Sequence, residues 1–339
     1  MTETMHWFRP AFRITATLIA GAILLWMLTT MVGCGPNNSD SSANGDKPGL
    51  RKIRLALNWY PEAEHGGFYA AQLAGFFEEE GLDVEIIPGG PGVPVIQQVA
   101  GGSIQFGVAE ADQIPLGRAQ DAGVVALMTP LKHSPRCVMV HEESGITRLE
   151  DLKGVTLAMN PGRGFSDFMT HHLPLEDVRI VPYSGNVGPF LRDKKFATQA
   201  YEFSEPHVAA ERGASPVTLP VRDIGYDPYT SLLFTSDRLL TEDRELATAM
   251  TRACLKGWQH YLEDPTETNA HLETLNSEMT PEALAFGVEA IRPLCEFGEE
   301  RYGQMTLDRW KTLCAQLEEV KLLAPGRVKP EECFSADIF

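Results

Sequence analysis

The sequence predicts an α/β protein made of two successive units, and three features of its pattern agree on this. Short apolar runs typical of strands alternate with helical patterns from residue 52 to residue 219. Such alternation favours largely parallel sheets that are flanked by helices. The series restarts after residues 142–152, and from Thr241 onward the pattern is almost wholly helical. No fixed-period repeat is visible, which disfavours a solenoid or a propeller.

The first unit opens with a strand at 52–58, where apolar and polar residues alternate. A helix follows at 66–80, because Tyr69, Phe76 and other apolar residues fall on one helical face before Gly81. The later elements of this unit are strands at 83–87, 104–108, 124–128 and 136–141 and helices at 93–100 and 114–121.

The second unit repeats the alternation, and the C-terminal part then turns helical. Its predicted elements are strands at 155–159, 178–182, 196–201 and 217–219 and helices at 165–172, 187–193 and 205–212. Beyond residue 241, apolar residues recur at helical spacing and predict core-facing helices. These residues are Leu246, Met250, Cys254, Trp258 and Leu262, and later Leu307, Trp310, Leu313 and Leu317.

The N-terminus has the order of an export signal, with basic residues followed by an uncharged stretch at 14–33. This stretch ends in Met-Val-Gly-Cys, which resembles the lipobox of bacterial lipoproteins, with Met31 in place of the usual Leu. We therefore predict a lipoprotein signal peptide at 1–34 that ends at a lipidated Cys34, and a flexible, polar tether at 35–50. The alternative is an uncleaved membrane anchor, since about 20 apolar residues can span a bilayer. Both alternatives place the folded body outside the inner membrane, in the periplasm or at the cell surface.

Charge and cysteine content exclude several classes of protein. The chain has 29 Lys and Arg against 46 Asp and Glu, and a net charge of −17 argues against a nucleic-acid partner. The five cysteines after Cys34 show no CxxC spacing, so buried free thiols are expected rather than a zinc or redox site, with one disulfide among the last four cysteines as the alternative. Adjacent histidines on a helix diverge in direction, so no metal site is predicted at His171 and His172.

Several segments carry a family resemblance, above all LALNWYPEAEHGGFYAAQLAGFFEEEGLDVEI at 55–86, with VAGGSIQFGVAEAD at 99–112 and LEDLKGVTLAM at 149–159. They resemble the ABC-transporter solute-binding proteins that are grouped with thiamine-pyrimidine synthases and aliphatic sulfonate-binding proteins. The resemblance implies a two-lobed type II periplasmic binding protein, in which each lobe has a mixed, mainly parallel sheet flanked by helices. Lobe 1 would comprise 51–142 and 230–339, lobe 2 would comprise 143–229, and the ligand would lie between them.

Polar and aromatic residues cluster where predicted strands end, which is where open α/β sheets bind ligands. Trp59 could stack on an aromatic ring, and Asn58, His65 and Glu110 could form hydrogen bonds with a heterocycle. Arg163 precedes a helix and could bind an anionic group of the ligand.

Other residues near these strand ends leave alternatives open. Tyr69 is a candidate for either ring stacking or the core, and the loop at 89–92 for either an anion site or a tight turn. Glu62 and Glu64 are expected to be solvated loop charges. The resemblance adds Glu202 and Glu205 as acidic contacts from the second lobe.

Comparison with the related synthases favours a binding protein over an enzyme. They carry a cysteine-rich cluster in the segment that corresponds to 223–234, and this chain has no cysteine there. They also use pyridoxal phosphate, whose Schiff base needs a lysine, and none occurs between Asn58 and Ile104. We expect no catalysis and no cofactor.

The predicted function is therefore capture of a small heterocyclic nutrient, related to the thiamine pyrimidine precursor, for an ABC permease. The protein is expected to contact the membrane through the lipid anchor at Cys34. The alternatives are a synthase-like enzyme, a binder of sulfonate or riboflavin-type ligands, and a surface lipoprotein that binds a protein partner.

Overall fold

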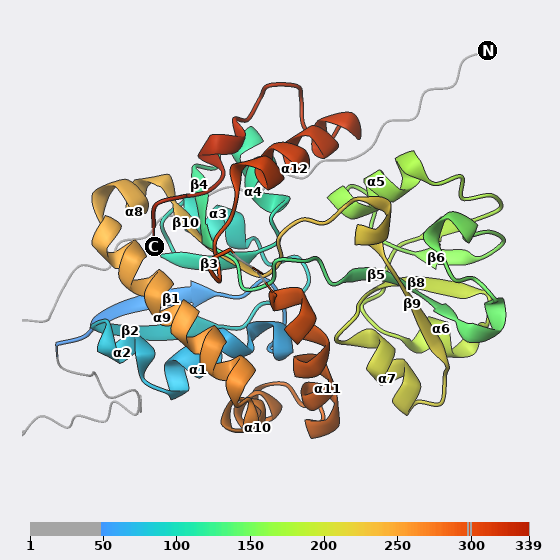
Figure 1. Ribbon diagram of the computed structural model, residues 1–339, viewed down its shortest axis with the longest axis horizontal. Helices are drawn as coiled ribbons and strands as arrows, with labels where there is room; N and C mark the ends of the chain where they lie inside the picture. Colours follow the sequence, from blue (N-terminus) through green and yellow to red (C-terminus); the bar gives the residue numbers. More distant parts are fainter. Residues whose placement is uncertain (1–48, 297, 299, 339) are drawn as a thin grey trace, which may run out of the picture. The chain divides into compact units, whose positions relative to one another are not determined.

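The computed structural model describes residues 49–296, 298 and 300–338 (Figure 1). The predicted signal peptide, Cys34 and the tether up to residue 48 lie outside the described residues. The described chain forms two five-stranded sheets flanked by helices, which confirms the predicted α/β class. Among the described residues, none of the helices combines the length and the apolar character that a membrane span requires.

The sheet of the first lobe has the strand order β2-β1-β3-β10-β4. Its strands are β2 (Leu82–Ile87), β1 (Arg51–Ala56), β3 (Phe106–Ala109), β10 (Leu232–Ser236) and β4 (Val124–Met128). β1 is parallel to β2 and β3, whereas β10 is antiparallel to β3 and β4. The sequence pattern does not predict β10, because all five of its residues are buried and show no alternation.

Helices cover both faces of this sheet, and alternate strand residues face each layer. Leu55 and Phe106 pack in a core with helices α1 and α9, whereas Ala56 and Phe234 pack in another core with α3 and α4. The helices are α1 (Gly66–Leu73), α2 (Phe76–Glu79), α3 (Val95–Ala100), α4 (Gln113–Ala119) and α9 (Arg244–Glu263). The predicted single helix at 66–80 is interrupted at Gly75, whose φ of 77° is left-handed.

Glycines allow α1 and α9 to approach closely. A Cβ atom on Gly67 would lie 2.1 Å from the Trp258 ring, and one on Gly257 would lie 2.3 Å from the carbonyl oxygen of Gly67. Gly67 on α1 and Gly257 on α9 are therefore packing residues, and they fix the position of α1 after the segment that leads from β1 into the cleft.

The sheet of the second lobe has the order β7-β6-β8-β5-β9. Its strands are β7 (Arg179–Val181), β6 (Thr156–Ala158), β8 (Phe196–Tyr201), β5 (Arg136–His141) and β9 (Pro216–Pro220). Its helices are α5 (Gly164–His172), α6 (Gly188–Arg192) and α7 (Glu205–Glu211).

Both sheets contain one reversed strand in the fourth position, β10 in the first and β5 in the second. Each follows a passage of the chain from one sheet to the other, and Leu131 and Thr230 of the two passages form an antiparallel bridge. β5 belongs to the second sheet, so the predicted lobe boundary after residue 142 lies too late in the chain. The change of pattern at 142–152 marks a loop inside the second lobe rather than the passage between lobes.

The C-terminal part is helical, as predicted. Its remaining helices are α8 (Asp237–Glu242), α10 (Thr266–Leu275), α11 (Pro281–Ile291) and α12 (Leu307–Glu319). Trp258 on α9 and Trp310 on α12 are fully buried, which confirms both as core residues. α12 lies against α5 of the second lobe (Figure 1), and their apolar residues share one core.

Candidate functional site

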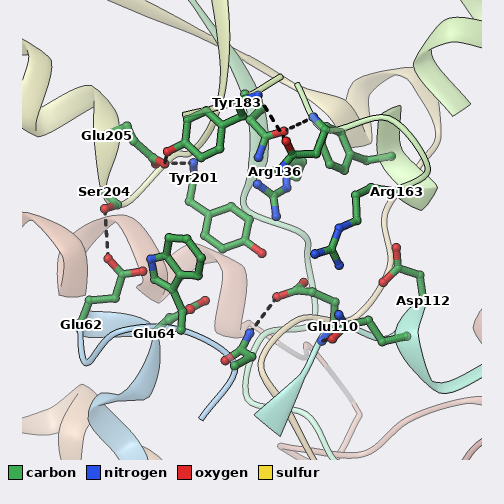
Figure 2. Close-up of a pocket in the computed structure, with 16 residues that line it drawn as sticks. Glu62, Glu64, Glu110, Asp112, Arg136, Arg163, Tyr183, Tyr201, Ser204 and Glu205 are labelled. Carbon is green, nitrogen blue, oxygen red and sulfur yellow. Dashed lines mark hydrogen bonds between the residues drawn. The ribbon is translucent and has the colours of Figure 1, made fainter. Parts of the chain in front are cut away.

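A cavity of about 160 Å³ lies between the two lobes (Figure 2). We call it the inner cavity. The first lobe lines it with Asn58, Trp59, Glu62, Glu64, Glu110, Asp112 and Gln113, and the second lobe with Arg136, Asn160, Arg163, Phe165, Tyr183, Gln199, Tyr201, Ser204 and Glu205. Most of these residues follow the carboxyl ends of β1, β3, β6, β7 and β8. The position agrees with the rule for ligand sites in open α/β sheets.

The inner cavity is rich in carboxyl groups, with five of them against two guanidinium groups. The structure buries Glu62 and Glu64, at 5% and 1% exposure, so the expectation of solvated loop charges is wrong for both. They follow a strand end, but the loop turns inward through a short 3-10 helix at Ala63–His65. The burial of Glu62 and Glu64 has a chemical consequence, because buried carboxyl groups require partners.

A chain of hydrogen bonds connects three residues of the first lobe at the cavity. His65 Nε2 lies 2.9 Å from Asn58 Oδ1, and Asn58 Nδ2 lies 3.4 Å from Glu110 Oε1. Burial lowers the pKa of His65 to about 3, so its ring is neutral and its Nε2–H donates to Asn58. His65 thereby holds the Asn58 amide with its nitrogen toward Glu110.

Glu64 is the least exposed of the carboxyl groups that line the cavity, and it forms a hydrogen bond with a residue before β10. Ser231 Oγ donates to Glu64 Oε2 at 3.1 Å. Burial raises the pKa of Glu64 well above its ordinary value, and the charges of Glu62 and Glu110 raise it further. Burial also raises the pKa of Glu110 and of Asp112.

Arg136 of β5 supplies the positive charge at the centre of the second lobe's wall. Its guanidinium carbon lies 3.9 Å from the centroid of the Tyr201 ring and 4.7 Å from that of Phe165. The rings form a cation–π cage around it. Its charge partly offsets the effect of burial on the pKa of Glu110.

The two lobes meet directly at Glu62. Ser204 of the second lobe donates to Glu62 Oε2 at 3.1 Å, and nearby Glu205 accepts from Tyr183 Oη at 2.6 Å and from the Tyr201 N–H at 2.8 Å (Figure 2). Burial, together with the charge of Glu205, raises the pKa of Glu62 to about 8. Near neutral pH, Glu62 therefore holds a proton that it can donate.

A second, outer cavity of about 620 Å³ adjoins the inner one, and both are lined by Trp59 and Arg163. The glycine loop at 89–92 reaches this outer cavity. Gly89 donates its N–H to the carbonyl oxygen of Trp59 at 3.0 Å, and a Cβ atom on it would lie 2.2 Å from the carbonyl oxygen of Leu57. Gly89 thus packs against the backbone that carries Trp59.

The comparisons with known proteins agree with this fold. Residues 62–268 match the family model described as NMT1/THI5 like. This chain belongs to the NMT1/THI5-like family. Its relatives include a formylaminopyrimidine-binding protein of Halalkalibacterium halodurans, which is 27% identical over 92% of this chain and 97% of the relative. A 4-amino-5-hydroxymethyl-2-methylpyrimidine phosphate synthase of Saccharomyces cerevisiae is 24% identical over 64% of this chain and 68% of the relative.

Solved structures with this fold include sulfonate-binding proteins. The SsuA protein of Escherichia coli has a TM-score of 0.67 at 14% identity, covering 83% of this chain and 91% of that protein. SsuA of Xanthomonas axonopodis pv. citri, bound to MOPS, has a TM-score of 0.64 at 15% identity, covering 86% and 99%. These likenesses confirm the periplasmic-binding-protein fold, and the family model confirms the resemblance that the sequence indicates.

In this member of the NMT1/THI5-like family, five of the eight predicted ligand-binding residues line the inner cavity. They are Asn58, Trp59, Glu110, Arg163 and Glu205.

Three predicted residues lie elsewhere. His65 lies behind Asn58, and Tyr69 is buried in the first lobe beside the His271 ring of α10, at 5.6 Å between centroids. Glu202 forms an ion pair with Arg222 outside the inner cavity.

The sequence prediction lacks Arg136, Tyr183 and Gln199, which also line the inner cavity. Arg136 carries the one available signal, because it is a charged residue at the start of a strand whose next four residues are apolar. Tyr183 and Gln199 lie in segments without any pattern that distinguishes a binding residue from a surface residue.

Proposed function

We propose that this protein is the extracytoplasmic solute-binding component of an ABC importer and that it captures a small amino-substituted pyrimidine in the inner cavity. The observation that carries the proposal is the excess of carboxyl groups beside an indole ring. An aminopyrimidine offers N–H donors to ionised carboxylates and ring nitrogens to a protonated one. The family relative named as a formylaminopyrimidine-binding protein supports this ligand class.

The residues of the cavity suit such a ligand in three ways. Trp59 supplies an aromatic face for ring stacking. Glu110 and Glu205 supply acceptors for amino groups, and Glu62 supplies a donor, since its pKa is about 8. Asn58 and Arg163 complete the polar lining.

Anionic and larger ligands fit this lining less well. A sulfonate would enter a cavity that holds five carboxyl groups and only two guanidinium groups. A riboflavin-type ligand exceeds the inner cavity of about 160 Å³ and would have to extend into the outer cavity, since pockets for drug-sized ligands measure roughly 300–1,000 Å³. We therefore favour a ligand with a single ring.

Titration calorimetry with formylaminopyrimidine, an alkanesulfonate and riboflavin tests the ligand class. We expect the pyrimidine to bind most tightly, and Trp59→Ala to weaken it by about 1–3 kcal/mol, the range for bases stacked on aromatic side chains. Phe286→Ala is the matched control, because Phe286 is an aromatic residue that is 37% exposed and does not line the inner cavity. Tight sulfonate binding that Trp59→Ala leaves unchanged would refute the proposal.

The proposed location rests on the N-terminal sequence. We propose that Cys34 is lipidated and tethers the folded body to a membrane, beside the permease that receives the ligand. Several acyl chains, at about 0.8 kcal/mol per buried CH₂, suffice for stable anchoring. Labelling with a radioactive fatty acid should mark the wild type and not Cys34→Ser, and equal labelling of the two would contradict the anchor.

A further inference from the structure

Three metal-ligating side chains converge where α5 lies against α12. His171 and His172 end α5, and Glu319 ends α12. All three are exposed, and their ligand atoms lie within 4.8 Å of one another. The cluster is separate from the inner cavity, since none of the three lines it.

The distances within the cluster are close to those of a metal site. Glu319 Oε1 lies 3.6 Å from His171 Nε2 and 3.4 Å from His172 Nε2. Zn²⁺ binds imidazole nitrogen and carboxylate oxygen at about 2.0–2.1 Å, so tetrahedral coordination separates two ligand atoms by roughly 3.3 Å. The two separations between a histidine nitrogen and Glu319 already match this value. A small rotation of the exposed imidazole rings brings the two histidine nitrogens to the same separation.

We propose that His171, His172 and Glu319 bind one divalent transition-metal ion such as Zn²⁺, with water as the fourth ligand. Two imidazole groups and one carboxylate suit Zn²⁺, Co²⁺, Ni²⁺ and Cu²⁺, whereas Mg²⁺ and Ca²⁺ take oxygen ligands. The net charge of −17 favours the approach of any cation.

The elements that carry the ligands are fixed by packing. Phe168 and Met169 on α5 and Leu313 and Leu317 on α12 are buried in one core. The Phe168 ring also lies 4.2 Å from the His172 ring, between centroids, and restricts its orientation. Ligands on packed helices lose little freedom when they bind a metal.

The sequence argument against this site is correct for one helix in isolation. Adjacent histidines diverge, but Glu319 comes from a helix distant in the chain and lies within reach of both rings. Bound metal would tie α5 of the second lobe to α12, and binding to the folded protein alone would raise its melting temperature.

Cobalt titration of the full chain, purified without a histidine tag and treated with a chelator, tests this site. We expect one Co²⁺ per chain with the visible absorbance of tetrahedral cobalt, displaced by Zn²⁺, and a Zn²⁺-dependent rise in melting temperature. His172→Ala and Glu319→Gln should weaken binding at least tenfold, since even outer-shell substitutions cost about 10- to 100-fold.

The control variant is His207→Ala. His207 lies 3.4 Å from Glu211 on α7, but no second imidazole is grouped with this pair in the described chain. The variant His207→Ala should leave the cobalt affinity unchanged. Circular dichroism confirms that each variant is folded. The proposal fails if wild type shows no tetrahedral cobalt spectrum, or if both ligand variants retain its affinity.

Discussion

The two lobes contribute opposite charges to the inner cavity. The first lobe supplies four carboxyl groups and no basic residue to its lining, namely Glu62, Glu64, Glu110 and Asp112. The second lobe supplies Arg136 and Arg163 against the single carboxyl group of Glu205. Either wall alone would hold charges without partners, so each lobe needs the other to stabilise its side of the cleft.

The lobes also differ in how they hold their charges. Burial raises the pKa of Glu62, Glu64, Glu110 and Asp112, which brings these carboxyl groups toward their neutral forms. Arg136 keeps its charge and is held by the aromatic rings of Tyr201 and Phe165. Burial thus disfavours the charged forms of the acidic groups of the first lobe, whereas cation–π contacts stabilise the charged Arg136 of the second lobe.

Replacing Arg136 should have the largest effect on the charge balance between the two lobes. Arg136→Met should lower the free energy of unfolding by about 3 kcal/mol, because the carboxyl groups that face it lose a buried partner. Urea unfolding of the unliganded protein measures the change. Arg163→Met is the control, since Arg163 is exposed, and it should cost less than about 1 kcal/mol. Equal losses in the two variants would show that Arg136 does not stabilise the acidic wall.

Removing one acidic group of the first lobe should act mainly on ligand affinity. Glu110→Gln should weaken aminopyrimidine binding by about 1–3 kcal/mol, because an N–H donor of the ligand loses its carboxyl acceptor. That corresponds to roughly a five- to hundredfold rise in Kd, measured by calorimetry. Glu202→Gln makes the same chemical change outside the inner cavity and should leave Kd unchanged. The reverse order of effects would place the ligand against Glu202.

Titration of Glu62 gives a further test of the difference between the lobes. Its pKa is about 8 in the folded protein and 4.5 as the ordinary value, so between these pH values the folded state binds the extra proton. Stability should therefore fall as pH rises from about 4.5 to 8, with a slope of up to about 1.4 kcal/mol per pH unit.

Urea unfolding across this pH range measures that slope for wild type and for Glu62→Gln. The variant cannot take up the proton and should show a flatter profile. Glu78→Gln, on α2, replaces a glutamate outside the inner cavity and should keep the wild-type slope. An unchanged slope in Glu62→Gln would assign the pH dependence to other groups.

The sequence predicts the alternating elements of both lobes well, because strands such as β1 and helices such as α9 carry clear periodicity. It does not predict β10, which is buried throughout, or the passage between sheets ahead of β5. Periodicity reports burial on one face of an element and contains no information about which sheet a strand joins.

The site is predictable only in part, for a related reason. Strand ends identify Asn58 and Glu110, because parallel strands bring their carboxyl ends to one edge. Glu62 accepts a hydrogen bond from Ser204 of the other lobe and lies near the charge of Glu205, and Glu64 accepts a hydrogen bond from Ser231, 167 residues away. Contacts over such distances leave no local pattern in the sequence.

The smallest expected effect is that of pyridoxal phosphate, the cofactor that the resemblance associates with the related synthases. The basic residues of the inner cavity are the two arginines of the second lobe, and no lysine lines this cavity in the described part of the chain. A Schiff base requires a lysine amine, and a guanidinium group does not replace it. Incubation with pyridoxal phosphate should therefore give no stoichiometric Schiff-base absorbance. Borohydride trapping followed by peptide mass spectrometry checks for weak, scattered labelling of surface lysines, and unfolded protein serves as the control for such labelling. One fully labelled lysine in the folded protein, protected by an aminopyrimidine, would show that a lysine reaches the cleft and would favour an enzyme over a binding protein.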